Sequence, residues 1–300
     1  MYHDLFNLNY LQSLCQRYHL KPTAKYGQNF LIDPAPLEKM FAAAELKPDD
    51  TIVEIGPGFG ALTLALSPRV GRVVALEIEK KLQPYWEEQL KQQKNLEIVW
   101  GNALREIQQS HSAGSGQAAD SAISQQYKVV ANLPYQITSA LIRAFLEASH
   151  PPQLMVLMVQ REVAERICAR PGEMSLLSVA VQYYAAPEII ALVPRQAFWP
   201  EPKVDSAILK VKVKSKKFTP SQAEGENGVK KKFAREFFRV VKAGFSNRRK
   251  LLIKNLAAVA GKGQQTELGR IFGTWSLPPT VRAQELSVAQ WEELTKILLG

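Results

Sequence analysis

A chain of 300 residues has room for one large domain or two smaller ones, and a hydrophobic content of 46% can supply a sizeable core. The net charge of +10 favours an anionic partner, most often nucleic acid or an anionic membrane surface. The apolar runs are too short to cross a bilayer, and the N-terminus lacks a secretory signal pattern, so we expect no membrane partner. Two cysteines and four scattered histidines favour a cytoplasmic protein with neither disulfides nor a metal site.

Apolar runs alternate with helical patterns over the first two thirds of the chain. We expect a helix over 4–20, a loop over 21–34 and a helix over 35–46. Five strands are predicted within 50–60, 72–79, 95–104, 128–135 and 153–160, with helices between them. This alternation predicts an α/β fold with a doubly wound parallel sheet. Residues 177–198 and 203–214 are rich in Val and Ile and predict an antiparallel pair at its edge.

Three further segments do not fit that sheet. Residues 108–126 are mostly Gln, Ser, Ala and Gly, which predicts an exposed, mobile insertion between strands. Residues 219–229 read as a polar linker, and only helical patterns follow it. The sequence therefore predicts an α/β domain over 1–215 and a small all-helical domain over 216–300.

Positive charge is concentrated between residues 210 and 254. Eleven Lys and four Arg there outnumber three Glu, a net charge of +12, so the rest of the chain carries −2. A charge run is often only a solvated face. Here the basic clusters alternate with Phe233, Phe237, Phe238 and Phe245 in a helical pattern, which favours a surface that binds phosphates.

A glycine-rich turn follows the first predicted strand. In "EIGPGFGA", Gly56, Gly58 and Gly60 allow close approach of a ligand, and the next helix N-terminus offers N–H groups to negative charge. Glu77 ends the second strand 21 residues after Gly56, where an acid can hold ribose hydroxyls. Asn102 follows the third strand, where an adenine amine would be recognised. A plain tight turn and a surface acid are the alternatives, and the shared strand edge favours a nucleotide-like cofactor.

The stretch "NLPY" ends the fourth predicted strand, beside that crevice. The Asn132 amide oxygen and the Leu133 carbonyl can accept hydrogen bonds from an exocyclic amine, while Pro134 fixes the turn. Tyr135 offers a face on which a base can stack. Two acceptors would orient the lone pair of an adenine N6 toward a methyl sulfonium without a general base. An ordinary turn is the alternative, but the upstream glycine turn favours methyl transfer to a base amine.

Seven motifs in this order resemble the KsgA/RsmA family of small-subunit ribosomal RNA adenine dimethyltransferases. They are "KYGQNFL", "VEIGPGFGALT", "ALEIE", "GNAL", "VANLPYQITSALI", "MVQREVAERI" and "FWPEPKVDSAIL". The resemblance, from about Lys25 to the C-terminal helices, implies a Rossmann-like methyltransferase domain that uses S-adenosylmethionine. The implied substrate is 16S rRNA in the immature small ribosomal subunit. Two adjacent adenosines in its 3′-terminal hairpin would each receive two methyl groups on N6.

The resemblance also implies roles for individual residues. The implied cofactor contacts are Asn29, Leu31, Gly56, Gly58, Glu77, Asn102 and Asn132. Asn132 and Leu133 would orient the amine, and Tyr135 and Phe198 would sandwich the target adenine. One departure is Asn102, where the family usually has Asp; its carbonyl must face the amine to replace the acid.

Three other functions remain open from the sequence. A large-subunit rRNA dimethylase of the antibiotic-resistance type shares "NLPY", although "FWPEPKVDS" and the long helical C-terminal region fit the small-subunit type better. An RNA-binding assembly factor with little catalysis would not need the intact glycine turn. An NAD-dependent oxidoreductase would need a proton donor that the sequence does not offer. We expect a monomeric enzyme.

Overall fold

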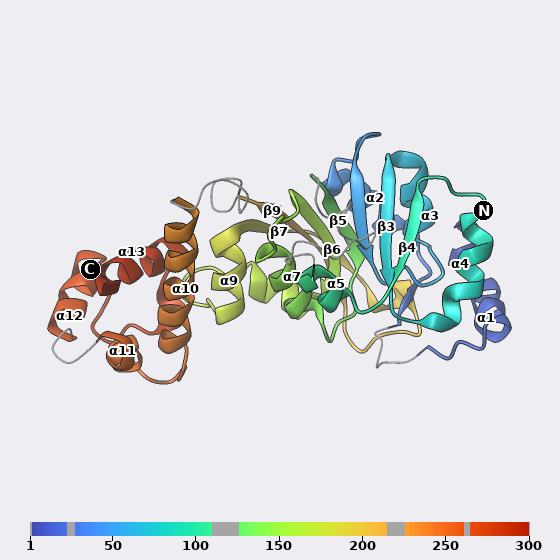
Figure 1. The fold of residues 1–300 in the computed structure, drawn as a ribbon. Coiled ribbons are helices and arrows are strands. Elements are labelled where there is room, and N and C mark those ends of the chain that lie inside the picture. The colour runs from blue at the N-terminus through green and yellow to red at the C-terminus, as the bar shows by residue number, and fades with distance from the viewer. Residues whose placement is uncertain (1, 23–27, 110–125, 215–225, 261–264, 300) are drawn as a thin grey trace. The chain divides into compact units, whose positions relative to one another are not determined.

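A computed structural model of the chain describes residues 2–22, 28–109, 126–214, 226–260 and 265–299 (Figure 1). The chain divides into two compact units. The first comprises Met1–Ala164 and Ala185–Ser215, and the second comprises Glu165–Tyr184 and Lys216–Gly300. The sequence-based division at 215/216 had placed the segment 165–184 with the first domain. The predicted insertion at 108–126 lies almost entirely outside the described residues, and so does the predicted linker up to residue 225. The last four residues of that linker, 226–229, are instead the first turn of a helix.

A seven-stranded mixed sheet forms the centre of the first unit. Its strands are β2 (Thr51–Ile55), β3 (Arg72–Glu77), β4 (Leu96–Trp100), β5 (Lys128–Asn132), β6 (Leu154–Gln160), β7 (Ala185–Val193) and β9 (Ser206–Val213). Their order in the sheet is β4-β3-β2-β5-β6-β9-β7. Strands β2 to β6 run parallel, and β9 lies antiparallel to both β6 and β7. The predicted parallel sheet with an antiparallel edge pair is confirmed.

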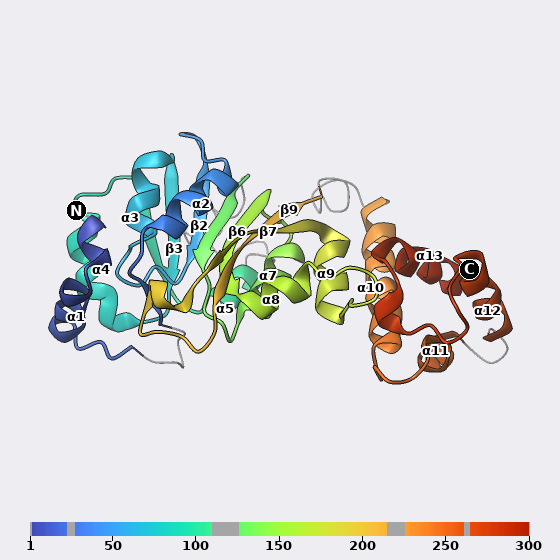
Figure 2. The same cartoon turned by 180° about the vertical axis from the view of Figure 1, so that it is seen from behind.

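Helices cover both faces of this sheet. They are α2 (Ala35–Ala44), α3 (Thr63–Leu66), α4 (Gln83–Leu90), α5 (Ala103–Gln109) and α7 (Thr138–Leu146). A further helix, α8 (Arg161–Ile167), contains the boundary between the two units. Helices α5 and α7 lie on the face seen in Figure 1, and α2 and α3 lie on the opposite face, seen in Figure 2. Because both faces are covered, the central strands are mostly apolar; Val53, Val129 and Val156 are fully buried.

Two expectations for the N-terminal part of the chain need correction. Instead of one helix over 4–20, a short 3₁₀ helix (Tyr2–Phe6) precedes α1 (Leu8–Arg17). The break occurs at Asn7, whose side chain accepts a hydrogen bond from the Tyr10 backbone N–H at 3.1 Å. The predicted loop at 21–34 contains the strand β1 (Phe30–Leu31), which pairs antiparallel with β8 (Phe198–Trp199).

The segment expected as one long strand over 177–198 is instead a helix followed by a strand. Helix α9 (Leu176–Tyr184) precedes β7, although its sequence is rich in Val and Tyr. Ser175 caps this helix, because its Oγ accepts a hydrogen bond from the Ser178 N–H at 3.2 Å, and Ser178 Oγ accepts one from the Ser175 N–H at 2.6 Å. The capping residues thus prevail over the strand propensity.

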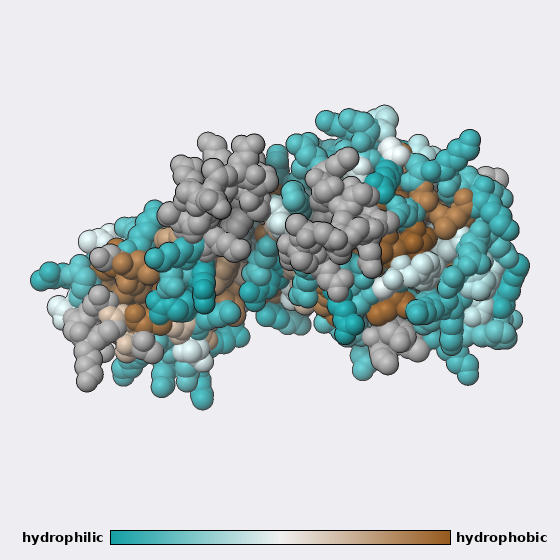
Figure 3. Space-filling model, in the orientation of Figure 1, coloured by the Kyte–Doolittle hydropathy of each residue, from teal (hydrophilic) through white to brown (hydrophobic). Residues whose placement is uncertain are grey.

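The second unit is helical in its described part. It contains α9, α10 (Glu226–Gly244), α11 (Leu252–Ala260), α12 (Gln265–Thr274) and α13 (Val288–Leu299). Phe237, Leu252 and Trp291 are fully buried. At the end of α10 a Cβ on Gly244 would overlap the Trp291 ring, so glycine allows these elements to pack closely. Figure 3 shows hydrophobic residues of this unit among hydrophilic ones. Among the unit's described residues, Leu176, Ile297 and Leu299 are the large apolar side chains that are exposed.

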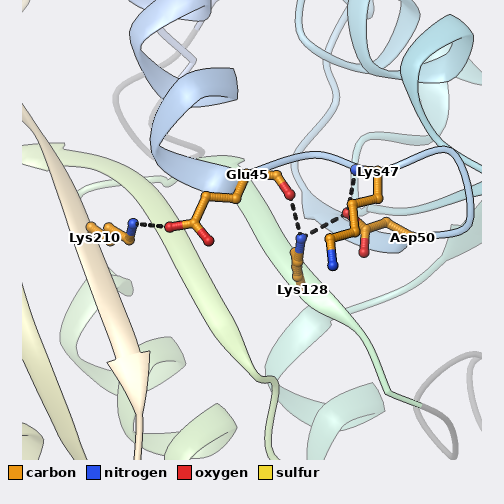
Figure 4. Close-up of polar contacts among 5 residues, drawn as sticks. All are labelled: Glu45, Lys47, Asp50, Lys128 and Lys210. Atoms are coloured by element: carbon orange, nitrogen blue, oxygen red, sulfur yellow. Dashed lines mark hydrogen bonds and ion pairs between the residues drawn. The ribbon is translucent and has the colours of Figure 1, made fainter.

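A polar network ties the C-terminal end of α2 to the sheet at the edge where the parallel strands begin (Figure 4). Lys128 Nζ donates to the Glu45 carbonyl and to Asp50 Oδ2, both at 2.7 Å. Asp50 Oδ2 also accepts from the Lys47 N–H at 2.7 Å, and Lys210 Nζ contacts Glu45 Oε1 at 2.7 Å. Lys128 is only 7% exposed, so these bonds replace the water that its ammonium loses on folding.

Candidate active site

A pocket lies at the opposite edge of the sheet, where β2 and β5 end. Strand β2 has β3 on one side and β5 on the other, so the chain winds outward in both directions from this point. Sheets of this kind bind ligands at such a switch point. The lining residues include Asn29, Leu31, Gly56, Gly58, Glu77 and Asn132 from the sequence-based prediction. The structure thus brings together six of the seven residues expected to contact a cofactor.

The glycine turn is held open by its backbone conformation and by aromatic residues. Gly58 and Gly60 have φ values of +57° and +88°, which favour glycine. A Cβ on Gly60 would lie 2.7 Å from the Trp86 ring, so a larger residue has no room there. Trp86 Nε1 donates to the Gly58 carbonyl at 3.0 Å, and Tyr85 Oη donates to the Phe59 carbonyl at 2.6 Å. Helix α4 therefore fixes the shape of the turn.

Glu77 is buried at the end of β3 and faces the turn. Its Oε2 accepts from the Gly58 N–H at 3.1 Å, while Oε1 accepts from the N–H groups of Ile78 and Glu79 at 2.8 and 2.7 Å. Burial raises the pKa of the Glu77 carboxyl, and these backbone N–H groups oppose that rise. The carboxylate is held rigidly and lines the pocket, as a ribose-binding acid requires.

Glu54, on β2, is a lining residue that the sequence analysis missed. It is 2% exposed, and burial raises the pKa of its carboxyl to about 8. Within the described part of the chain, neither Glu54 Oε2 nor the buried Thr63 Oγ1 has a hydrogen-bond partner. An orphaned buried carboxyl oxygen at a pocket marks a place for a donor or a cation. The acid preceding the glycine turn was the available signal in the sequence.

The "NLPY" stretch meets the glycine turn in this pocket. Asn132 and Pro134 both line it, and a Cβ on Gly56 would lie 4.0 Å from Pro134 Cγ. Asn132 Nδ2 donates to the Asn29 carbonyl at 3.3 Å. This bond uses the donor end of the amide, so Oδ1 remains the end that can accept from an incoming amine.

The other residues predicted to act on the base differ in exposure. The Leu133 side chain is 2% exposed and its N–H donates to the Met158 carbonyl at 3.0 Å, which fixes the backbone at the end of β5. Tyr135 is half-buried, and its hydroxyl lies 2.7 Å from Ser206 Oγ. Phe198 is 2% exposed and belongs to the hydrophobic core. In this conformation the Tyr135 side chain is therefore more accessible to a base than the Phe198 side chain. The sequence alone did not predict this difference.

Asn102 does not line the pocket in this structure. It is exposed before α5, and its Oδ1 accepts from the Leu104 N–H at 3.0 Å. The carbonyl that was expected to face an adenine amine is therefore engaged as a helix cap. Ile78 was not predicted, yet it lines the pocket and is 48% exposed, an apolar surface beside Glu77.

The basic residues of the second unit are exposed where they are described. Arg248, Arg249 and Lys250 lie between α10 and α11, and Arg235 and Arg239 lie on α10. Among the described residues, no group of three His, Cys, Asp or Glu side chains could hold a metal ion. No helix in the same residues is long and apolar enough to cross a membrane.

Comparison with known proteins agrees with this geometry. Residues 20–298 match the family model described as ribosomal RNA adenine dimethylase. The "Ribosomal RNA small subunit methyltransferase A" of Dehalococcoides mccartyi is 40% identical over 283 residues, covering 94% of this chain and 90% of that protein. The protein of the same name from Geobacillus kaustophilus is 36% identical, covering 99% and 98%.

Two solved structures share the fold. The 23S rRNA methyltransferase ErmE has a TM-score of 0.67 at 24% identity, covering 91% of this chain and all of that one. A dimethyladenosine transferase from Plasmodium falciparum has a TM-score of 0.66 at 23% identity, covering 88% and 95%. The match of the family model over nearly the whole chain shows that this protein belongs to the ribosomal RNA adenine dimethylase family.

Proposed function

We propose that this chain transfers methyl groups from S-adenosylmethionine to N6 of two adjacent adenosines in the 3′-terminal hairpin of 16S rRNA. The observation that carries this proposal is the convergence of Asn132, the glycine turn and Glu77 on one pocket at the switch point of the sheet. The relatives named as small-subunit methyltransferases, similar over 90% of the chain or more, support the choice of rRNA. A ribosomal substrate also implies a cytoplasmic location, and we expect a monomer.

The pocket residues suit S-adenosylmethionine by their chemistry. Glu77 would accept from ribose hydroxyls, and the exposed Ile78 would lie against the adenine. Glu54, whose Oε2 has no partner within the described residues, would face the ammonium of the methionine part. Asn29 and Leu31, from the loop and from β1, would close the pocket beside the glycine turn. The cofactor supplies an electrophilic methyl group.

The chain's own part in the reaction is positioning. Asn132 Oδ1 and the Leu133 carbonyl would accept the two N–H groups of the target amine and orient its lone pair outward. Proximity and orientation can then lower the barrier without an ionised base. The adenosine must leave its stack in the RNA to reach this pocket, and Tyr135, joined by Phe198 after a rearrangement, would replace the lost stacking.

The Asn102 contact becomes weaker under this proposal. Its Oδ1 caps α5, so the amide presents Nδ2, a donor that suits an adenine ring nitrogen better than the exocyclic amine. An Asn102→Asp variant should therefore bind S-adenosylmethionine at least as tightly as the parent.

A methyl-transfer assay with tritiated S-adenosylmethionine tests the proposed function. The substrates are naked 16S rRNA, immature small subunits lacking the modification, and 23S rRNA. We expect incorporation into the immature subunits at the two adjacent adenosines. Incorporation into 23S rRNA alone would favour a large-subunit dimethylase, and RNA binding without incorporation would favour an assembly factor.

A further inference from the structure

Ser206 lies between two neighbouring strands of the sheet. It is the first residue of β9, it is fully buried, and β9 pairs with strands on both sides. In the ladder it lies opposite Gln160 of β6 and Val193 of β7. A side chain at such a position has a fixed origin, because two neighbouring strands hold its backbone.

The hydroxyl of Ser206 meets the ring of Tyr135. The two oxygens are 2.7 Å apart, the usual distance for an O–H···O hydrogen bond, which fixes the far end of the tyrosine ring. Tyr135 follows the strand end in a turn, where its ring would otherwise rotate about two side-chain bonds. Stacking on a base needs only the ring face, which phenylalanine also has. The hydroxyl therefore serves to hold the ring in place, and Ser206 is its anchor.

The neighbouring residue, Asp205, holds the segment that leads to Phe198. Asp205 Oδ1 accepts from the Arg195 N–H at 3.0 Å, at the start of the turn before β8. The Asp205 carbonyl accepts from the N–H of Arg161, the residue that follows β6, at 3.0 Å. Two successive residues thus anchor Tyr135 and the approach to Phe198 to the same point of the sheet.

We infer that Ser206 is a positioning residue that holds the Tyr135 ring ready to stack on the target adenine. This inference rests on the proposed function, because it needs Tyr135 to receive the base. Holding the ring before the base arrives lowers the cost of ordering it on binding, which is the usual gain from preorganisation. Ser206 acts only through the tyrosine hydroxyl, so its contribution disappears when that hydroxyl is removed.

A double-mutant cycle with Ser206→Ala and Tyr135→Phe tests this directly. Single-turnover methylation of immature small subunits at saturating cofactor gives the rate and its half-saturating RNA concentration. We expect each single variant to lower the rate constant divided by that concentration about three- to tenfold, and the double variant to fall no further. A hairpin RNA with 2-aminopurine at the target position should show less stacking in all three variants.

The control is Ser67→Ala. Ser67 is also a buried serine, and its hydroxyl bonds Gln93 and Asn95, far along the chain from Tyr135. It should leave methylation and 2-aminopurine stacking unchanged. Multiplicative losses in the double variant, or a Ser206→Ala rate equal to that of an active parent, would overturn the positioning role alone. A parent that methylates none of the RNA substrates would overturn the proposed function and this role with it.

Discussion

The buried ammonium of Lys128, where β5 begins, and the buried carboxyl of Glu54, near the end of β2, lie toward opposite edges of one sheet. Lys128 has two partners at 2.7 Å, whereas Glu54 Oε2 has none within the described residues. At the edge where β5 begins, the Lys128 ammonium is paired, and its bonds hold α2 against the sheet. The other edge leaves a costly buried group unsatisfied. The difference indicates which edge serves stability and which serves a ligand.

The largest effect should come from breaking the satisfied edge. Lys128→Met removes the ammonium and leaves Asp50, whose side chain is only 15% exposed, without its ionic partner. We expect the free energy of unfolding to fall by about 3 kcal/mol, as for other buried pairs that lose one member. Denaturant unfolding measures this.

Lys210→Met is the matched control for that variant. Its partner Glu45 has a side chain that is 68% exposed, so water can replace the lost ammonium. The loss should stay below about 1 kcal/mol. Equal losses in both variants would show that burial does not distinguish these two lysines.

The buried carboxyl of Glu54 should make the free energy of unfolding depend on pH. The pKa of Glu54 is about 8 in the folded chain and 4.5 ordinarily, so between these values the folded state keeps a proton that the unfolded state loses. Glu54 therefore stabilises the fold fully below pH 4.5, and this contribution is lost as the pH rises toward 8. The expected loss is on the order of a few kcal/mol between pH 5 and 8.

Calorimetric unfolding of the ligand-free protein at several pH values checks this sign. Glu54→Gln cannot ionise and should lack that part of the pH dependence. Glu97→Gln, which alters a partly exposed pair with Arg72, should follow the parent. Identical pH profiles for Glu54→Gln and the parent would mean that burial does not raise the pKa of the Glu54 carboxyl.

A smaller effect is expected for Glu77, which is buried like Glu54 but has three backbone donors. Glu77→Ala should weaken S-adenosylmethionine binding by ~1–3 kcal/mol, because the ribose hydroxyls lose a charged acceptor. Titration calorimetry measures the affinity, with Glu97→Ala as the control. An unchanged affinity would remove Glu77 from the cofactor site.

Substitution of exposed charged residues should have the smallest effect on stability and on cofactor binding. Reversing Arg248, Arg249 and Lys250 to Glu should leave stability and cofactor affinity unchanged, because all three side chains are exposed. RNA affinity should fall about tenfold or more, and its salt dependence should flatten. Filter binding at several salt concentrations tests this. Unchanged RNA binding would show that the cluster is only a solvent-exposed surface and does not contact RNA.

The sequence predicted the sheet more completely than it predicted the site. Alternating apolar strands and helices predicted the order of elements, and the glycine turn, Glu77 and Asn132 meet as expected. Helix α9 was missed because two serines cap a Val-rich segment. The composition of this segment favours a strand, and it does not show that the cap outweighs this preference. The burial of Phe198 and the cap made by Asn102 depend on packing and local hydrogen bonds, which a motif does not encode.

The rate of methyl transfer by Asn132→Ala tests the central claim most directly. Asn132 Oδ1 should matter most as the adenine nitrogen becomes pyramidal, so its loss belongs to the transition state. In single-turnover methylation of immature small subunits at saturating cofactor, we expect a rate about 100-fold below the parent. Asn95→Ala, which removes an amide bonded to the Ser67 and Val70 carbonyls, should keep the parent rate. A near-normal rate for Asn132→Ala would contradict the proposed mechanism.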